Sequence, residues 1–154
     1  MPVLTLETPN ALKEFLGKEI GVSDWLVITQ ERINKFAEAT EDRQWIHMDR
    51  ERAQRESPFK GTIAHGFLTL SLVSHLIKDV VRISGGTRLA INYGLNRVRF
   101  PSPVREGSKI RARFSLVSFQ DRGEAQEAVF TCAVKCDGSS KPCCVAEWIV
   151  RYYK

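Results

Sequence analysis

The sequence predicts one α+β domain over residues 1–154, in which helices fill the first half and an antiparallel sheet fills the second. From Gly66 to Ile83 the chain is long enough for several helical turns, and the first half of this run is apolar almost all round, as a buried helix requires. Beyond Gly85-Gly86, apolar and polar residues alternate along several segments, which is typical of strands with one face in a core. The helix and the sheet must therefore cover each other.

Three shorter helices are predicted before the long one, because each candidate begins at a residue that caps helices well. The caps are Thr8, Thr29 and Asp49, and the helices run to about Leu16, Thr40 and Arg55. One strand is predicted among them, from Val22 to Ile28. The stretch from Asp42 to His47 is predicted to be a loop beside a helix, where a rigid scaffold can present side chains to a substrate.

The second half is predicted to form four strands joined by polar turns. These strands lie near residues 89–100, 110–116, 128–136 and 145–152. An antiparallel sheet wrapped around a long central helix is the hot-dog fold, and this is the fold class that we predict.

Neither a signal peptide nor a membrane span is predicted. The segment from Met1 to Glu7 has no basic leader and no sustained apolar core. Polar residues interrupt the longest apolar run before it reaches membrane-spanning length: Ser71, Ser74, His75, Lys78 and Asp79. We therefore expect a cytoplasmic protein with no membrane partner.

The four cysteines, Cys132, Cys136, Cys143 and Cys144, all fall in the last quarter of the chain. Cys132 and Cys136 lie in an alternating segment, and the adjacent Cys143 and Cys144 point to opposite faces if that segment is extended. Buried reduced thiols in a cytosolic sheet are therefore favoured over a zinc site, and no metal is predicted.

The formal charge of +5 is spread over the whole chain rather than gathered in a stripe. Nucleic acid usually requires a clustered basic surface, so it is not an expected partner. A ligand that carries phosphates would be favoured by the same positive balance.

Two short segments carry the candidate chemistry. Asp42 and His47 lie five residues apart, and an imidazole that titrates near neutral pH can exchange a proton while a carboxylate holds a water molecule. Taken alone, Asp42 is better explained as a loop residue that caps its own turn. Gly66 opens the long helix, where the first N–H groups lack partners and a negative charge is favoured, and it has no side chain to keep a substrate away. His65 is expected to be a structural hydrogen-bonding residue rather than a proton carrier.

Three segments resemble one known family. They are Phe36 to Asp49, Gly61 to Ser71, and Asn92 to Val104 with Gly107 following. The chain resembles the MaoC-like (R)-specific enoyl-CoA hydratases, and most closely their nodulation-protein-N-like branch, from about Gly17 onward. The first two segments are specific to the family and the third supports them.

This resemblance implies a hot-dog homodimer that adds water reversibly, in the syn sense, to trans-2-enoyl-CoA and gives (R)-3-hydroxyacyl-CoA. The catalytic aspartate and histidine of the family match Asp42 and His47. The glycine whose backbone N–H receives the thioester oxygen matches Gly66, and a serine that helps to order the site in some members matches Ser74. No cofactor is implied.

The chain departs from the family pattern around the catalytic pair. Glu41 stands where the family most often has glycine, and Gln44-Trp45 stands where it most often has Asn-Pro. Gln44 keeps an amide with donor and acceptor capacity on a longer stem, so it stays a candidate for orienting the site or the substrate.

Two other functions stay open, the first because of these departures and the second because an acid near a helix N-terminus can also direct water to a thioester carbonyl. A noncatalytic protein of this fold would bind an acyl thioester without turnover. A hot-dog thioesterase would direct water to the thioester carbonyl and release a free thiol, which hydration does not. The sequence leaves the acyl chain length open, and either coenzyme A or acyl carrier protein could carry the acyl group.

Overall fold

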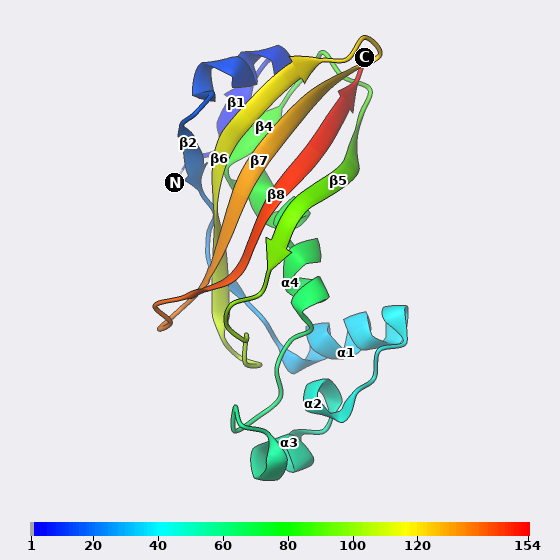
Figure 1. Ribbon diagram of the computed structural model, residues 1–154, viewed down its shortest axis with the longest axis vertical. Helices are drawn as coiled ribbons and strands as arrows, with labels where there is room; N and C mark the ends of the chain where they lie inside the picture. Colours follow the sequence, from blue (N-terminus) through cyan, green and yellow to red (C-terminus); the bar gives the residue numbers. More distant parts are fainter. Residues whose placement is uncertain (1) are drawn as a thin grey trace.

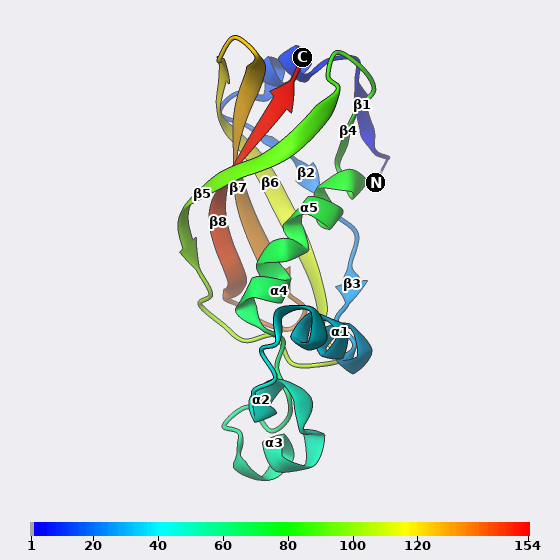
Figure 2. The same cartoon turned by 90° about the vertical axis from the view of Figure 1, so that its right-hand side faces the viewer.

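A curved antiparallel sheet and a helical layer across its inner face form the body of the protein (Figures 1 and 2). The computed structural model describes residues 2–154. Its main sheet has the strand order β2-β6-β7-β8-β5, with β3 also paired to β6. The strands are β2 (Glu19–Val22), β3 (Leu26–Val27), β5 (Leu89–Arg99), β6 (Lys109–Asp121), β7 (Ala125–Cys136) and β8 (Pro142–Tyr153). A second, two-stranded sheet pairs β1 (Leu4–Leu6) with β4 (Val81–Ile83) in parallel.

The helices form two groups. The central group lies against the sheet and comprises α4 (Gly66–Ser71), α5 (Val73–Leu76) and the 3₁₀ turn η2 (Ile77–Asp79). The other group extends beyond one end of the sheet (Figure 2) and comprises α1 (Gln30–Thr40), α2 (Trp45–Met48) and α3 (Arg50–Glu56). A 3₁₀ helix, η1 (Pro9–Phe15), lies near the N-terminus. Within residues 2–154, no helix combines the length and apolar character that crossing a bilayer requires.

The core lies between the central helices and the sheet. Leu72 and Leu76 belong to the same buried cluster as Phe114 of β6 and Phe130 of β7, and both phenylalanines are fully buried. Alternate residues of these strands point toward the helices, which is why the sequence alternates there. The sheet thus supplies a rigid backing for α4, whose first residue is Gly66.

The fold confirms the predicted hot-dog class, but the central helix is segmented and shorter than we predicted. It ends at Asp79, and Val81 to Ile83 form strand β4 instead of a last helical turn. Residues with β-branched side chains favour strands, and Leu4 to Leu6 provide the partner to which β4 pairs. The helix is also not buried all round, since Phe67 is 68% exposed.

Two further predictions need correction. The strand expected from Val22 to Ile28 is divided into β2 and β3, because the buried Ser23 bonds Ala112 with both its backbone N–H and its hydroxyl oxygen. The stretch predicted as a loop contains the one-turn helix α2, which carries His47. The predicted caps Thr29 and Asp49 are confirmed, since each side chain accepts a hydrogen bond from the backbone N–H three residues later.

Candidate active site

The candidate residues come together where α1 ends, α2 turns and α4 begins. Helix α1 ends at Thr40, and the next residue, Glu41, has a left-handed backbone with φ of 62°. This conformation favours glycine and explains why the family most often has glycine here. The turn at Glu41 brings the chain around so that Asp42 lies next to the side chain of His65.

His47 is a buried imidazole with a defined hydrogen bond. Its Nδ1 lies 2.7 Å from the carbonyl oxygen of Ile63, which can only accept, so Nδ1 carries the proton and donates it. In the neutral ring, Nε2 therefore holds the free lone pair. Burial lowers the pKa of His47, and repulsion from His65 adds to this, whereas the Ile63 hydrogen bond and the charge of Asp42 oppose it. The net pKa is below the ordinary value, so His47 is suited to accept a proton.

His65 supports both members of the candidate pair. Its Nε2 donates to the backbone carbonyl oxygen of Asp42 at 2.9 Å, and its ring stacks on that of His47 with centroids 3.8 Å apart. The side chain is almost fully buried, and its Nδ1 has no hydrogen-bond partner among residues 2–154. These contacts agree with the structural role that we expected for His65.

The carboxylate of Asp42 is about half exposed, and its Oδ2 lies 4.0 Å from Nε2 of His65. One carboxylate oxygen and one nitrogen from each of His47 and His65 lie within 4.8 Å of one another. One water molecule with hydrogen bonds of about 2.8 Å can span such a gap between two groups. The two imidazole planes are only 22° apart and stacked, so their in-plane lone pairs do not converge on one point, as ligands of a single ion must.

Gly66 is the first residue of α4, so its amide N–H is among those that have no acceptor within the helix. A Cβ at this position would lie only 3.0 Å from the ring of Phe100. The missing side chain therefore makes room for Phe100. The expected close approach of a substrate to Gly66 stays a prediction.

Gln44 and Ser74 lie outside the contacts of this group. Gln44 is exposed at the start of α2, where its side chain makes no capping hydrogen bond and its backbone oxygen accepts from the N–H of His47. Ser74 lies on α5, and its hydroxyl donates to the carbonyl oxygen of Ser71 in the same helical layer. Their roles in the site stay predictions.

Two residues that hold the site together, Gln30 and Thr62, were missed by the sequence analysis. Gln30 donates from Nε2 to the carbonyl oxygen of His47, and its Oε1 accepts from the hydroxyl of Thr62. The partners are 17 and 32 residues away in the chain, so no local pattern marks them.

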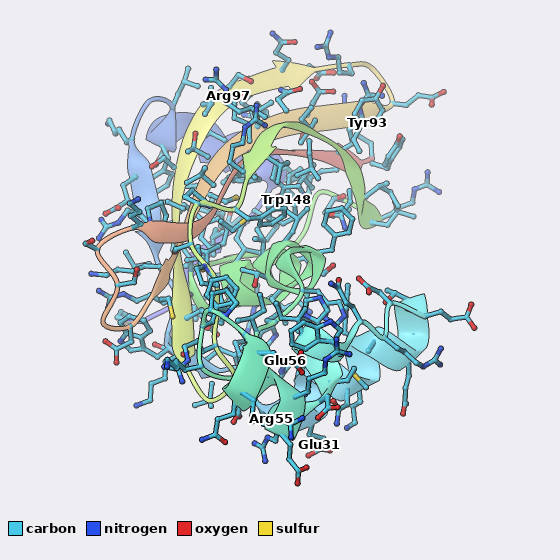
Figure 3. All side chains as sticks on the ribbon, turned by 60° about the horizontal axis from the view of Figure 1, so that its bottom comes forward. Glu31, Arg55, Glu56, Tyr93, Arg97 and Trp148 are labelled. Atoms are coloured by element: carbon cyan, nitrogen blue, oxygen red, sulfur yellow. The ribbon has the colours of Figure 1, made fainter. Side chains whose placement is uncertain are left out.

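Two adjoining cavities follow the central helix from one turn beyond Gly66. Their volumes are about 280 and 740 Å³, and they share Ser74, Asn92 and Trp148 among their linings. Figure 3 shows Trp148 in the space between the sheet and the helix, and its indole N–H donates to the Asn92 side chain at 3.0 Å. Leu70 and Trp148 give the smaller cavity a largely apolar wall.

All four cysteines are free and buried, as predicted. Burial raises the pKa of Cys143 to about 12 and that of Cys144 to about 11, and it also raises the pKa of Cys132. Metals and electrophiles react with thiolates, so Cys132, Cys143 and Cys144 act as packing residues rather than as reactive groups.

The fold and this group of side chains define a class: hot-dog proteins that present an acid and a histidine beside the start of the central helix. The MaoC like domain family matches residues 12–136. The 3-hydroxyacyl-thioester dehydratase Z of Mycobacterium tuberculosis is 51% identical over 149 residues, which cover 96% of this chain and 97% of that protein. Nodulation protein N of Rhizobium leguminosarum bv. viciae is 46% identical over 136 residues, covering 87% of this chain and 84% of that one.

The solved structure of a monoamine oxidase regulatory protein from Archaeoglobus fulgius has the same fold, with a TM-score of 0.78 and 24% identity over 100% of this chain and 99% of that one. The chain belongs to the MaoC-like dehydratase family, and it resembles the nodulation protein N branch as the sequence indicated. It is accordingly a hydratase or dehydratase, an enzyme of the lyase class.

Proposed function

We propose that the protein is an (R)-specific enoyl-CoA hydratase that adds water reversibly to trans-2-enoyl-CoA and gives (R)-3-hydroxyacyl-CoA. The observation that carries this proposal is the neutral, buried His47 within one water molecule's span of Asp42, beside the helix that starts at Gly66. The relatives named for 3-hydroxyacyl thioesters support it, since dehydration of such a thioester is the reverse of this hydration.

In the proposed mechanism, Asp42 holds the water and Nε2 of His47 takes its proton as the water oxygen attacks C3 of the enoyl group. Negative charge then develops on the thioester oxygen, where the Gly66 N–H stabilises the enolate. The protonated His47 returns the proton to C2, which restores the thioester. Because one group removes and returns the proton, both additions occur on the same face, which is the syn outcome.

The acyl chain is proposed to lie along the central helix, in the cavities that Leu70, Ser74 and Trp148 line. A CoA carrier suits the net charge of +5, since coenzyme A carries several negative phosphates. The same balance would attract an acyl carrier protein, so the assay below includes both carriers.

A homodimer is part of the proposal. β5 is the last strand of the sheet, and its outer edge has no partner among residues 2–154. Four of its large apolar side chains are exposed: Leu89, Ile91, Tyr93 and Leu95. A long apolar edge strand of this kind is usually covered by another chain. We also propose that residues 1–154 act as one domain in the cytoplasm, where the four free cysteines would stay reduced.

The test is the loss of enone absorbance when purified protein is mixed with crotonyl-CoA or crotonyl-acyl carrier protein. Asp42→Asn and His47→Gln should each lower kcat by about 10²- to 10⁴-fold, the usual contribution of a general acid or base. Chiral analysis should give the (R)-3-hydroxy product without release of free thiol. Full activity in both variants would contradict the proposed mechanism, and release of a free thiol would favour a thioesterase.

A further inference from the structure

A set of hydrogen bonds joins the segment that carries His47 to the segment that leads to Gly66. The side-chain amide of Gln30 donates to the carbonyl oxygen of His47 at 2.7 Å, and its Oε1 accepts from the Thr62 hydroxyl at 2.5 Å. Thr62 is 1% exposed and lies four residues before Gly66. Gln30 is thus the side chain through which both segments are bonded to α1.

Thr62 is itself held in place, and the next residue, Ile63, links it to the ring of His47. Its carbonyl oxygen accepts from the N–H of Glu106 at 3.0 Å. The next residue, Ile63, donates its N–H to the carbonyl oxygen of Ile46 and accepts the hydrogen bond from Nδ1 of His47. A displacement of Thr62 would therefore move the acceptor that fixes the ring orientation of His47.

The chemistry of a primary amide is required at Gln30. One group must donate to a carbonyl oxygen and accept from a hydroxyl, and only an amide among side chains of this length offers both at neutral charge. The second N–H bond of Gln30 goes to the side-chain oxygen of Asn34 at 2.9 Å, so the amide forms three hydrogen bonds. A glutamate would place an acceptor against the carbonyl oxygen of His47 and add a negative charge.

We infer that Gln30, acting through Thr62, is a positioning residue that fixes the imidazole of His47 relative to the Gly66 amide. This inference rests on the proposed hydration, because it assumes that His47 exchanges the proton. A small misplacement of a catalytic group can lower a rate by about 10²-fold without weakening binding. The contribution of Gln30 therefore belongs in kcat rather than in KM.

The kinetic test uses crotonyl-CoA and two pairs of variants of the full chain. Gln30→Met removes the polar group at similar length and should lower kcat by about 10-fold or more, with KM changed by less than about two-fold. Thr62→Val should have the same effect because it removes the hydroxyl at constant shape, whereas Thr62→Ser should keep a nearly normal kcat. Asn34→Ala, which removes only the third bond of the same amide, is the matched control and should also keep it.

A second readout does not depend on turnover. The pKa of His47 is measured by NMR titration of its ring in the wild type and in Gln30→Glu. The titratable groups that face His47 are Asp42 and His65, and both are unchanged in this variant. The added carboxylate should raise the pKa of His47 and move the acid limb of kcat/KM to higher pH. An unchanged pKa of His47 and an unchanged acid limb of kcat/KM would show that the side chain at position 30 does not lie close enough to His47 to orient it.

Failure of the inference about Gln30 can be told apart from failure of the proposed hydratase function. If wild-type protein hydrates crotonyl-CoA and Gln30→Met is equally fast, or if Gln30→Glu leaves the pKa of His47 unchanged, the inference is overturned and the proposed function stands. If the wild type does not turn over the substrate but Gln30→Glu raises the pKa of His47, the proposed function fails while the contact of Gln30 with the histidine is supported.

Discussion

His47 is set up as a base by the groups around it rather than by its position in the chain. The Ile63 carbonyl oxygen holds the proton on Nδ1, which leaves Nε2 free. Burial and the stacked ring of His65 disfavour a positive charge, while Asp42 favours one. The ring is thus neutral near neutral pH but close to a carboxylate that stabilises the imidazolium formed during the reaction, which is the combination that proton transfer requires.

The pH profile of the wild type should reflect this balance. An ordinary histidine has a pKa of about 6.5, and burial lowers the pKa of His47, so more than half of His47 is neutral at that pH. We expect the acid limb of kcat/KM for crotonyl-CoA to have its midpoint below pH 6.5, where His47 becomes protonated. A midpoint of the acid limb above pH 6.5 would contradict the assignment.

The lowered pKa of His47 also makes the stability of the protein depend on pH. Between the lowered pKa of the folded state and about 6.5, the unfolded chain binds more protons at His47 than the folded chain does. The free energy of unfolding contributed by this residue therefore decreases as pH falls through that window. It is constant above the unfolded pKa.

At the scale of elements, helix α1 has one contact with the site at each end. Its first residue, Gln30, bonds the backbone of His47, and its C-terminal turn at Glu41 leads directly into Asp42. The Thr29 cap fixes where this helix begins. Eleven residues of helix thereby set the spacing between the two candidate catalytic segments.

Glu41 is the strained point of this element. A left-handed backbone costs a residue other than glycine about 1–2 kcal/mol, so Glu41→Gly should raise the free energy of unfolding by about 1 kcal/mol, measured by urea denaturation. Glu38→Gly is the matched control, because it makes the same exchange at an exposed position inside α1 and should lower stability by about 1 kcal/mol. Equal destabilisation by both exchanges would show that Glu41 is not strained.

The sequence could predict those features that depend on residues close together in the chain. The caps Thr29 and Asp49, and the alternation that marks β6 to β8, are properties of short segments, and the structure confirms them. The predicted end of the central helix was wrong, because β4 becomes a strand only when β1, some 77 residues away, pairs with it. Gln30 was missed for the same reason, since its partners come from distant segments.

At the scale of the whole molecule, the sheet is covered on its inner face but exposes apolar side chains along its β5 edge. Its inner face is filled by α4 and α5, but the β5 edge exposes apolar side chains over most of an eleven-residue strand. A two-fold axis would pair this strand with its own copy, and each apolar residue would then meet an equivalent surface. The proposed homodimer would close this edge of the sheet.

Two substitutions test the β5 edge, and each replaces an exposed β-branched apolar residue by lysine. Ile91 on β5 and Val117 on β6 are both 45% exposed, so each can be changed to lysine without burying a charge in the monomer. Light scattering of the wild type should give twice the 17.5 kDa mass of one chain. Ile91→Lys should shift the protein toward monomer, because two like charges would meet across the two-fold axis, whereas Val117→Lys should leave the mass unchanged. A wild type that runs as a monomer would contradict the proposed homodimer, and an Ile91→Lys variant that stays fully dimeric would place the contact elsewhere than the β5 edge.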